Sequence, residues 1–92
     1  MIKVIASNQF LKFKKQAPPK LQLEIDKQVK AVMEDPAIGE LKKGDLKGIR
    51  VLKFKYNQQQ YLLSYEMKAD TLNLYILGSH ENYYTKLKRY LR

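Results

Sequence analysis

The sequence predicts a small α+β domain in which an N-terminal strand and a helical hairpin pack on an antiparallel sheet. Three observations support this prediction: an apolar stripe with helical spacing in the first half, three closely spaced β-rich segments in the second half, and short polar turns between those segments. The chain has 92 residues, the length of one domain. We therefore expect the order β-α-α-β-β-β-α in a single domain spanning residues 1–92, closed by a C-terminal helix.

The first half of the chain predicts a short strand and two helices. Residues 2–5 form the opening strand, and Ser7 or Asn8 offers an N-cap for the helix that follows. A Pro-Pro pair ends that helix and starts the next, because proline is tolerated in a first helical turn. Over residues 20–34, the apolar residues recur at steps of three and four and form one stripe: Leu21, Ile25, Val29, Val32 and Met33.

The second half predicts an antiparallel meander and a final helix. Residues 37–48 are a connection rich in glycine and lysine. Strands follow over residues 49–56, 60–67 and 71–77, and the short polar turns between them favour antiparallel pairing. Residues 81–91 then form the closing helix.

The charge of the chain points to an anionic partner. There are 18 Lys and Arg against 9 Asp and Glu, a net charge of +9, and the basic residues gather near both ends and around residues 42–55. Such segregation makes a basic face that suits a nucleic acid or an acidic protein. An ordinary solvated surface is the alternative.

Composition also limits the chemistry and the location. There are no cysteines and only one histidine, so we expect neither a metal site nor a cofactor. No apolar run approaches the length of a membrane span, and the N-terminal apolar run is too short for a signal peptide. We therefore expect a cytoplasmic protein without membrane contact.

Two lysines on one predicted strand are candidate site residues. Strand alternation places Leu52, Phe54 and Tyr56 toward the helices and turns Lys53 and Lys55 to the opposite face. Two like charges at alternate positions repel each other unless an anion or solvent lies between them. The pair therefore favours an anion site, with an ordinary polar sheet face as the alternative.

The only histidine follows the last predicted strand. Gly78 and Ser79 precede His80, and Tyr84 follows four positions later, one helical turn away, so we expect both side chains to point to the same patch. This segment alone brings a group that titrates near neutral pH close to a second proton carrier. A histidine that only caps the helix is the alternative.

Residues 48–55, 61–65 and 78–84, in this order and spacing, resemble the RelE/ParE superfamily of bacterial toxins. These are the toxin halves of type II toxin–antitoxin pairs. The resemblance implies a neutralising antitoxin from the adjacent gene. In the RelE-like branch it also implies cleavage of messenger RNA in the ribosomal A site.

The resemblance also suggests a role for each site residue. Lys53 and Lys55 match the family's lysine pair, His80 matches the histidine found in some members, and Tyr84 matches the aromatic that follows it, with Tyr83 beside it. Metal-free RNA cleavage needs an acid, a base and cations near the phosphate. We therefore expect His80 to be the general acid or its base counterpart, the lysines to stabilise charge or supply the base, and Tyr84 to stack on a base.

Other residues are expected to contact RNA or the ribosome: Arg50, Lys47, Lys42, Lys43, Tyr83, Lys86 and Arg89. One departure weakens the match, because Leu62 stands where the family often has an arginine. The ParE-like branch shares the fold, poisons DNA gyrase and generally lacks a nuclease site. A gyrase inhibitor without nuclease activity therefore remains the main alternative, and a nucleic-acid-binding regulator is a third.

Overall fold

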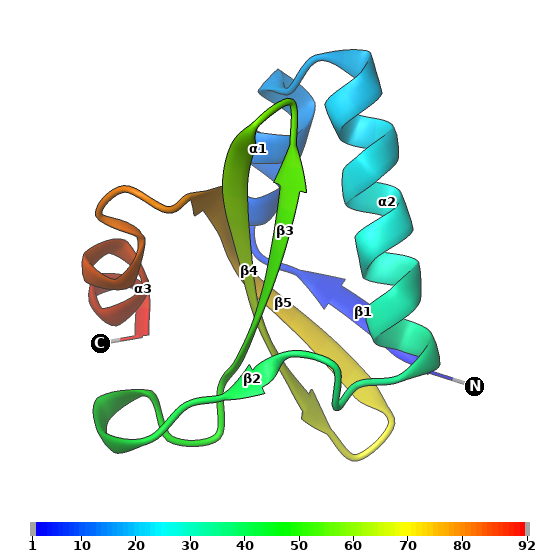
Figure 1. Cartoon of the computed structure of the whole chain (residues 1–92). Coiled ribbons are helices and arrows are strands. Elements are labelled where there is room, and N and C mark those ends of the chain that lie inside the picture. Colours follow the sequence, from blue (N-terminus) through cyan, green and yellow to red (C-terminus); the bar gives the residue numbers. More distant parts are fainter. Residues whose placement is uncertain (1, 92) are drawn as a thin grey trace.

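The protein is built in three layers, with a sheet between two helices on one side and one helix on the other (Figure 1). This computed structural model describes residues 2–91. Helices α1 (Asn8–Gln16) and α2 (Pro19–Glu34) cover one face, and α3 (Tyr83–Leu91) covers the other. The predicted α+β class is confirmed. No helix in residues 2–91 is long and apolar enough to cross a membrane.

The sheet has five strands in the order β1-β5-β4-β3-β2. Their bounds are β1 Lys3–Ala6, β2 Glu40–Leu41, β3 Arg50–Tyr56, β4 Gln59–Lys68 and β5 Thr71–Ser79. Strands β3, β4 and β5 form the predicted antiparallel meander, but β1 pairs with β5 in parallel, so the sheet is mixed. The strand β2 was not predicted, since two residues carry no periodic signal. It lies within the expected connection, as does a short 3-10 turn at Gly44–Leu46.

The turn between β3 and β4 fixes the register of the meander. Asn57 and Gln58 both have positive φ, 54° and 67°, as a two-residue hairpin turn of type I′ requires. This turn pairs Tyr56 with Gln59 and Lys55 with Gln60. The register decides which side chains of the two strands share a face.

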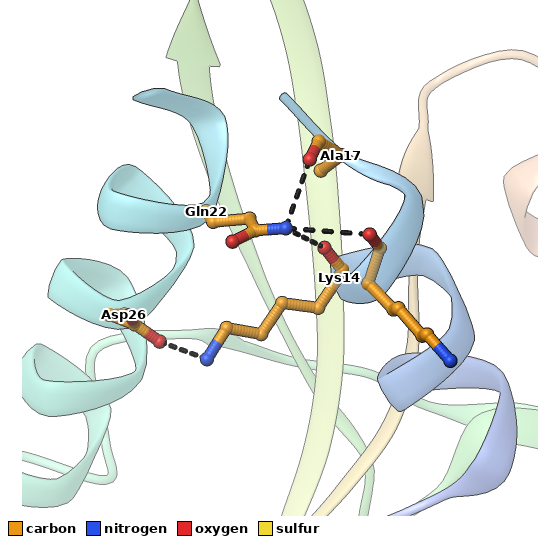
Figure 2. A network of polar contacts seen from close by, with 5 residues as sticks. Lys14, Ala17, Gln22 and Asp26 are labelled. Carbon is orange, nitrogen blue, oxygen red and sulfur yellow. Dashed lines mark hydrogen bonds and ion pairs between the residues drawn. The ribbon is translucent and has the colours of Figure 1, made fainter. Parts of the chain in front are cut away.

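Figure 2 shows how α1 and α2 are held together as a hairpin. The side-chain amide of Gln22 donates to the carbonyl oxygens of Lys14 at 2.9 Å and Ala17 at 3.0 Å, at the end of α1. The Lys14 carbonyl also accepts from the Ala17 N–H at 3.2 Å, and the Gln22 amide gives these last carbonyls of α1 a partner on α2. Lys14 also forms an ion pair with Asp26 of α2.

Each face of the sheet has its own apolar cluster, and β3 contributes alternate residues to both. Leu52, Phe54 and Tyr56 pack with the α1 and α2 side, as predicted. The cluster beneath α3 consists of Leu46, Ile49, Val51, Leu62, Ile76, Tyr83 and Leu87. Since Lys53 and Lys55 alternate with the first set, they lie on the α3 face.

A β-bulge interrupts the pairing of β4 and β5. Leu63 pairs with Leu77, but Tyr65 pairs with Leu74, so β5 has one extra residue opposite Ser64. The Ser64 hydroxyl replaces the lost ladder contacts: it accepts from the Ile76 N–H at 3.0 Å and donates to the Ile76 C=O at 3.2 Å. The bulge shifts the side-chain alternation of β5 for the residues that lead to His80.

Candidate functional site

Lys55, Gln60 and His80 form one row across three neighbouring chain segments. Lys55 is the register partner of Gln60, and the His80 N–H donates to the Gln60 C=O at 3.2 Å, so β5's pairing with β4 extends to His80. Neighbouring strands lie about 4.8 Å apart, which puts the backbones of Lys55 and His80 about 10 Å from each other. Lys53 lies about 7 Å along β3 from Lys55, two residues away.

These residues occupy the end of the sheet face that α3 leaves open. Lys53, Lys55 and His80 are all exposed. Within residues 2–91, none of their side chains forms an ion pair or a hydrogen bond. The charged and titratable groups are therefore available to a ligand. β2 pairs with β3 only at Arg50 and Val51, so within residues 2–91 the rest of β3 is an exposed strand edge. The two lysines also keep this edge from pairing with other chains.

Leu62 belongs to the apolar cluster beneath α3 and borders the open patch. It pairs with Lys53 on one side and Gly78 on the other, and its exposed fraction is 0%. An arginine here would bury its charge among apolar side chains. Leucine in place of the family's arginine therefore allows α3 to pack on this part of the sheet.

Tyr83 is a core residue. It is 1% exposed, and its hydroxyl donates to the Ile76 C=O at 2.5 Å. Burial raises the pKa of its phenol far above the usual value. The expectation that Tyr83 contacts RNA is therefore not met, because no surface of this side chain is available.

Tyr84 lies beside Lys42. The Lys42 ammonium sits 5.1 Å from the centre of the Tyr84 ring, and the ring meets that of Tyr83 edge-on at 5.6 Å. The helix begins at Tyr83, after Asn82 with φ of 56°, so His80 precedes it. The prediction that His80 and Tyr84 lie one helical turn apart is wrong, because the left-handed Asn82 comes between His80 and the helix.

Lys42 is already paired with an acid. Its ammonium lies 2.6 Å from the Glu40 carboxylate, and its side chain is only 18% exposed. The hydrogen bond to Glu40 raises the pKa of Lys42, and the same bond lowers the pKa of Glu40, which is also lowered by the nearby charge of Lys53. Lys42 therefore anchors Tyr84 and Glu40 at the border of the patch.

The other predicted contacts are spread around the molecule. Arg50 points to the opposite face and donates to the carbonyls of Ala37 at 3.3 Å and Gly39 at 2.9 Å, outside the patch. The remaining predicted contacts are exposed and lie on the α3 side: Lys43, Lys47, Lys86 and Arg89. Within residues 2–91, no three His, Cys, Asp or Glu side chains gather in a way that could hold a metal ion.

Two residues of the patch were not predicted. Gln60 lies between Lys55 and His80, and Glu40 borders Lys53. The first was accessible from the sequence, since a two-residue turn at positions 57–58 places residue 60 opposite residue 55. The second depends on β2, a strand of two residues that no sequence pattern predicts.

A protein-family model matches most of the chain. The family model described as ParE-like toxin of type II bacterial toxin-antitoxin system matches residues 4–88. No curated protein matches the chain in sequence.

Solved structures share the fold. The intact E. coli RelBE toxin–antitoxin complex contains a chain with a TM-score of 0.70 and 18% identity, covering 88% of this chain and 99% of that one. An arginine double mutant of E. coli RelE in the free state has a TM-score of 0.74 and 16% identity, covering 95% and 92%. The conserved hypothetical protein HP0894 from Helicobacter pylori has a TM-score of 0.53 and 27% identity, covering 87% and 96%.

Proposed function

Because the chain belongs to the ParE-like toxins of type II bacterial toxin–antitoxin systems, we propose that it is a ribosome-dependent endonuclease that cuts messenger RNA and so stops translation. The observation that carries this proposal is the exposed row of Lys55, Gln60 and His80, with Lys53 beside it. A ribosomal target puts its site of action in the cytoplasm.

The distance between Lys55 and His80 across the row suits a phosphate group. The flexible lysine side chains of Lys53 and Lys55 span several ångströms, so a phosphate bound above Gln60 lies within reach of both ammonium groups and of the His80 imidazole. In this pose the lysines lie where negative charge develops on the phosphorus oxygens. Such placed cations are the largest single contribution in many phosphate reactions.

The proposed reaction uses the RNA's own 2′-hydroxyl as nucleophile. The 2′-oxygen forms a bond to phosphorus, the bond from phosphorus to the 5′-oxygen breaks, and a 2′,3′-cyclic phosphate remains. His80, in its protonated form, gives its proton to the departing 5′-oxygen. One of the two lysines, in its neutral form, takes the proton from the 2′-hydroxyl, since a single imidazole cannot serve both oxygens in one turnover.

Binding rests on the charge of the whole surface together with stacking. Tyr84 is half-buried and offers the remaining part of its ring to an unstacked base beside the patch. Lys43, Lys47, Lys86 and Arg89 are exposed and attract the phosphates of ribosomal RNA. We also propose that a cognate antitoxin neutralises the toxin, as RelB is paired with RelE in the E. coli complex.

Cleavage on programmed ribosomes tests this function. Ribosomes carrying a defined messenger RNA are mixed with the purified protein, and primer extension locates the new 5′ ends. Cuts are expected within the A-site codon and not on the same RNA without ribosomes. Lys53→Ala and Lys55→Ala should each lower the rate about tenfold or more, whereas Lys20→Ala, an exposed position on α2, should not. Absence of ribosome-dependent cuts contradicts the proposal.

Inhibition of DNA gyrase is the second candidate function. The observation that favours it is the buried Leu62, which stands where the family often has an arginine. A gyrase inhibitor would block supercoiling of plasmid DNA in vitro and leave messenger RNA intact on ribosomes.

A further inference from the structure

Among residues 2–91, no strand pairs with the C-terminal half of β5 on the β1 side. β1 pairs with β5 only from Thr71 to Leu74. The Ser7 N–H then donates to the Leu74 C=O at 2.9 Å, and the chain turns away from the sheet into α1. The residues of β5 beyond this point face α1 across an open edge.

The ladder with β4 shows which backbone groups point to this edge. In an antiparallel pair, hydrogen-bonded and non-hydrogen-bonded residue pairs alternate. His80 donates to Gln60, so Gly78 turns its N–H and C=O toward β4, and Leu77 and Ser79 turn theirs to the opposite side. No residue within 2–91 bonds to those two N–H and two C=O groups, although Leu77 is only 5% exposed. Unpaired backbone groups in such a place favour a partner.

A groove of about 390 Å³ lies along this edge. Gln9, Lys12, Phe13 and Gln16 of α1 form one wall, and Tyr83 and Lys86 of α3 belong to the other. No acidic residue lines the groove, and both lysines are exposed. Its volume lies within the range of about 300–1,000 Å³ that is usual for binding sites.

Extending the proposed function, we propose that one extended, acidic segment of the antitoxin binds in this groove as an added strand beside Leu77–Ser79. A peptide backbone presents alternating donors and acceptors that match the free groups of Leu77 and Ser79. A DNA backbone presents only acceptors, and the 2′-hydroxyl donors of RNA do not follow the spacing of a strand. Acidic side chains on the segment pair with Lys12 and Lys86.

The walls of the groove favour a single segment over a second copy of this chain. Residues of α1 and α3 line the groove on either side of the β5 edge, and its volume of about 390 Å³ suits one extended segment better than the edge of another sheet with its own helices. An added strand here also runs on past Ser79 toward His80 and approaches the proposed cleavage patch from the α1 side. The toxin is then blocked without contact to Lys53 or Lys55 at the far edge.

Amide hydrogen exchange of the complex tests the inference. The chain is labelled with ¹⁵N and studied alone and bound to the protein encoded by the adjacent gene. The amides of Leu77 and Ser79 should exchange at least about tenfold more slowly in the complex, because a new hydrogen bond protects them. The amides of Lys53 and Lys55, on the free edge of β3, serve as controls and should not change.

Charge reversal provides the second measurement. Lys12→Glu with Lys86→Glu should weaken the complex about tenfold or more, and Lys20→Glu on α2 should not. This inference is overturned if the complex forms without protection of the Leu77 and Ser79 amides, or if its affinity is unchanged by the charge reversal. Either result leaves the proposed function standing. A chain that forms no complex with the adjacent protein overturns this inference and the proposal of an antitoxin from that gene, whereas the nuclease proposal is decided by the ribosome assay.

Discussion

Replacing Ser64 tests how the bulge holds the end of β5 in place. The Ser64 hydroxyl is the only acceptor that the Ile76 N–H has within residues 2–91, and both residues are buried, at 0% and 3% exposed. Ser64→Ala removes this acceptor and leaves a buried N–H unpaired, which costs about 1–3 kcal/mol. For a domain of this size, a loss of about 2 kcal/mol lowers Tm by roughly 8–16 °C.

Urea unfolding of the wild type and four variants measures this effect. Ser79→Ala is the matched control, because it makes the same chemical change on β5 at a hydroxyl without a hydrogen bond in the described residues, and should lie within about 0.5 kcal/mol of wild type. Tyr83→Phe should cost about 0.5–1.5 kcal/mol, since the Ile76 C=O keeps its bond from Ser64. The double change leaves that carbonyl with neither donor, so its loss should exceed the sum of the single losses. Equal stability of Ser64→Ala and Ser79→Ala would refute this reasoning.

Three further predictions concern other parts of the fold and the site. Burial, helped by the hydrogen bond to Glu66, raises the pKa of Tyr75 to about 12. The contribution of Tyr75 to the free energy of unfolding is therefore complete below about pH 10 and is lost as the pH rises toward about 12. Tyr75→Phe should flatten this part of the curve of stability against pH in urea titrations. Gln58 has φ of 67°, so Gln58→Gly should raise the free energy of unfolding by up to about 1 kcal/mol in urea titrations, and a loss would show that its side chain matters. Tyr84→Phe keeps the ring under Lys42 and should cut messenger RNA at nearly the wild-type rate, while Tyr84→Ala should be about tenfold slower; equal losses would assign the role to the hydroxyl.

Local patterns predicted much of the fold. The apolar stripe over residues 20–34 predicted the bounds of α2 within one residue. The alternation in residues 49–56 correctly placed Lys53 and Lys55 on the side of β3 that faces away from α1 and α2. Ser7 caps α1 as one of the two predicted residues, by accepting from the Phe10 N–H at 3.0 Å. These features depend on contacts between residues close in the sequence.

The missed features depend on distant contacts or on single backbone angles. The parallel pairing of β1 with β5 joins the two ends of the chain, and the bulge depends on a contact between Ser64 and Ile76. The left-handed conformation of Asn82 delays α3 by two residues relative to the predicted helix and thereby separates His80 from Tyr84. Asn is the residue type that adopts this conformation most readily after glycine, so its position was the one available signal.

The same limits apply to the site. Alternation places Arg50 on the face opposite Lys53, which the structure confirms, and its bonds to the carbonyls of residues 37 and 39 keep it there. The choice between Tyr83 and Tyr84 could not be made from the sequence, because it depends on which side of α3 meets the sheet. That packing buries Tyr83 against Ile76 and leaves Tyr84 at the surface.

The most direct test of the nuclease proposal is the single-turnover rate of messenger RNA cleavage on programmed ribosomes for His80→Ala. His80 is exposed and its side chain forms no hydrogen bond within residues 2–91, so the variant should fold as the wild type does. We predict a rate lower by roughly a hundredfold or more, with ribosome affinity almost unchanged, as expected for loss of a general acid. A folded His80→Ala protein that cuts at the wild-type rate would contradict the assignment of His80 and, with it, the proposed mechanism.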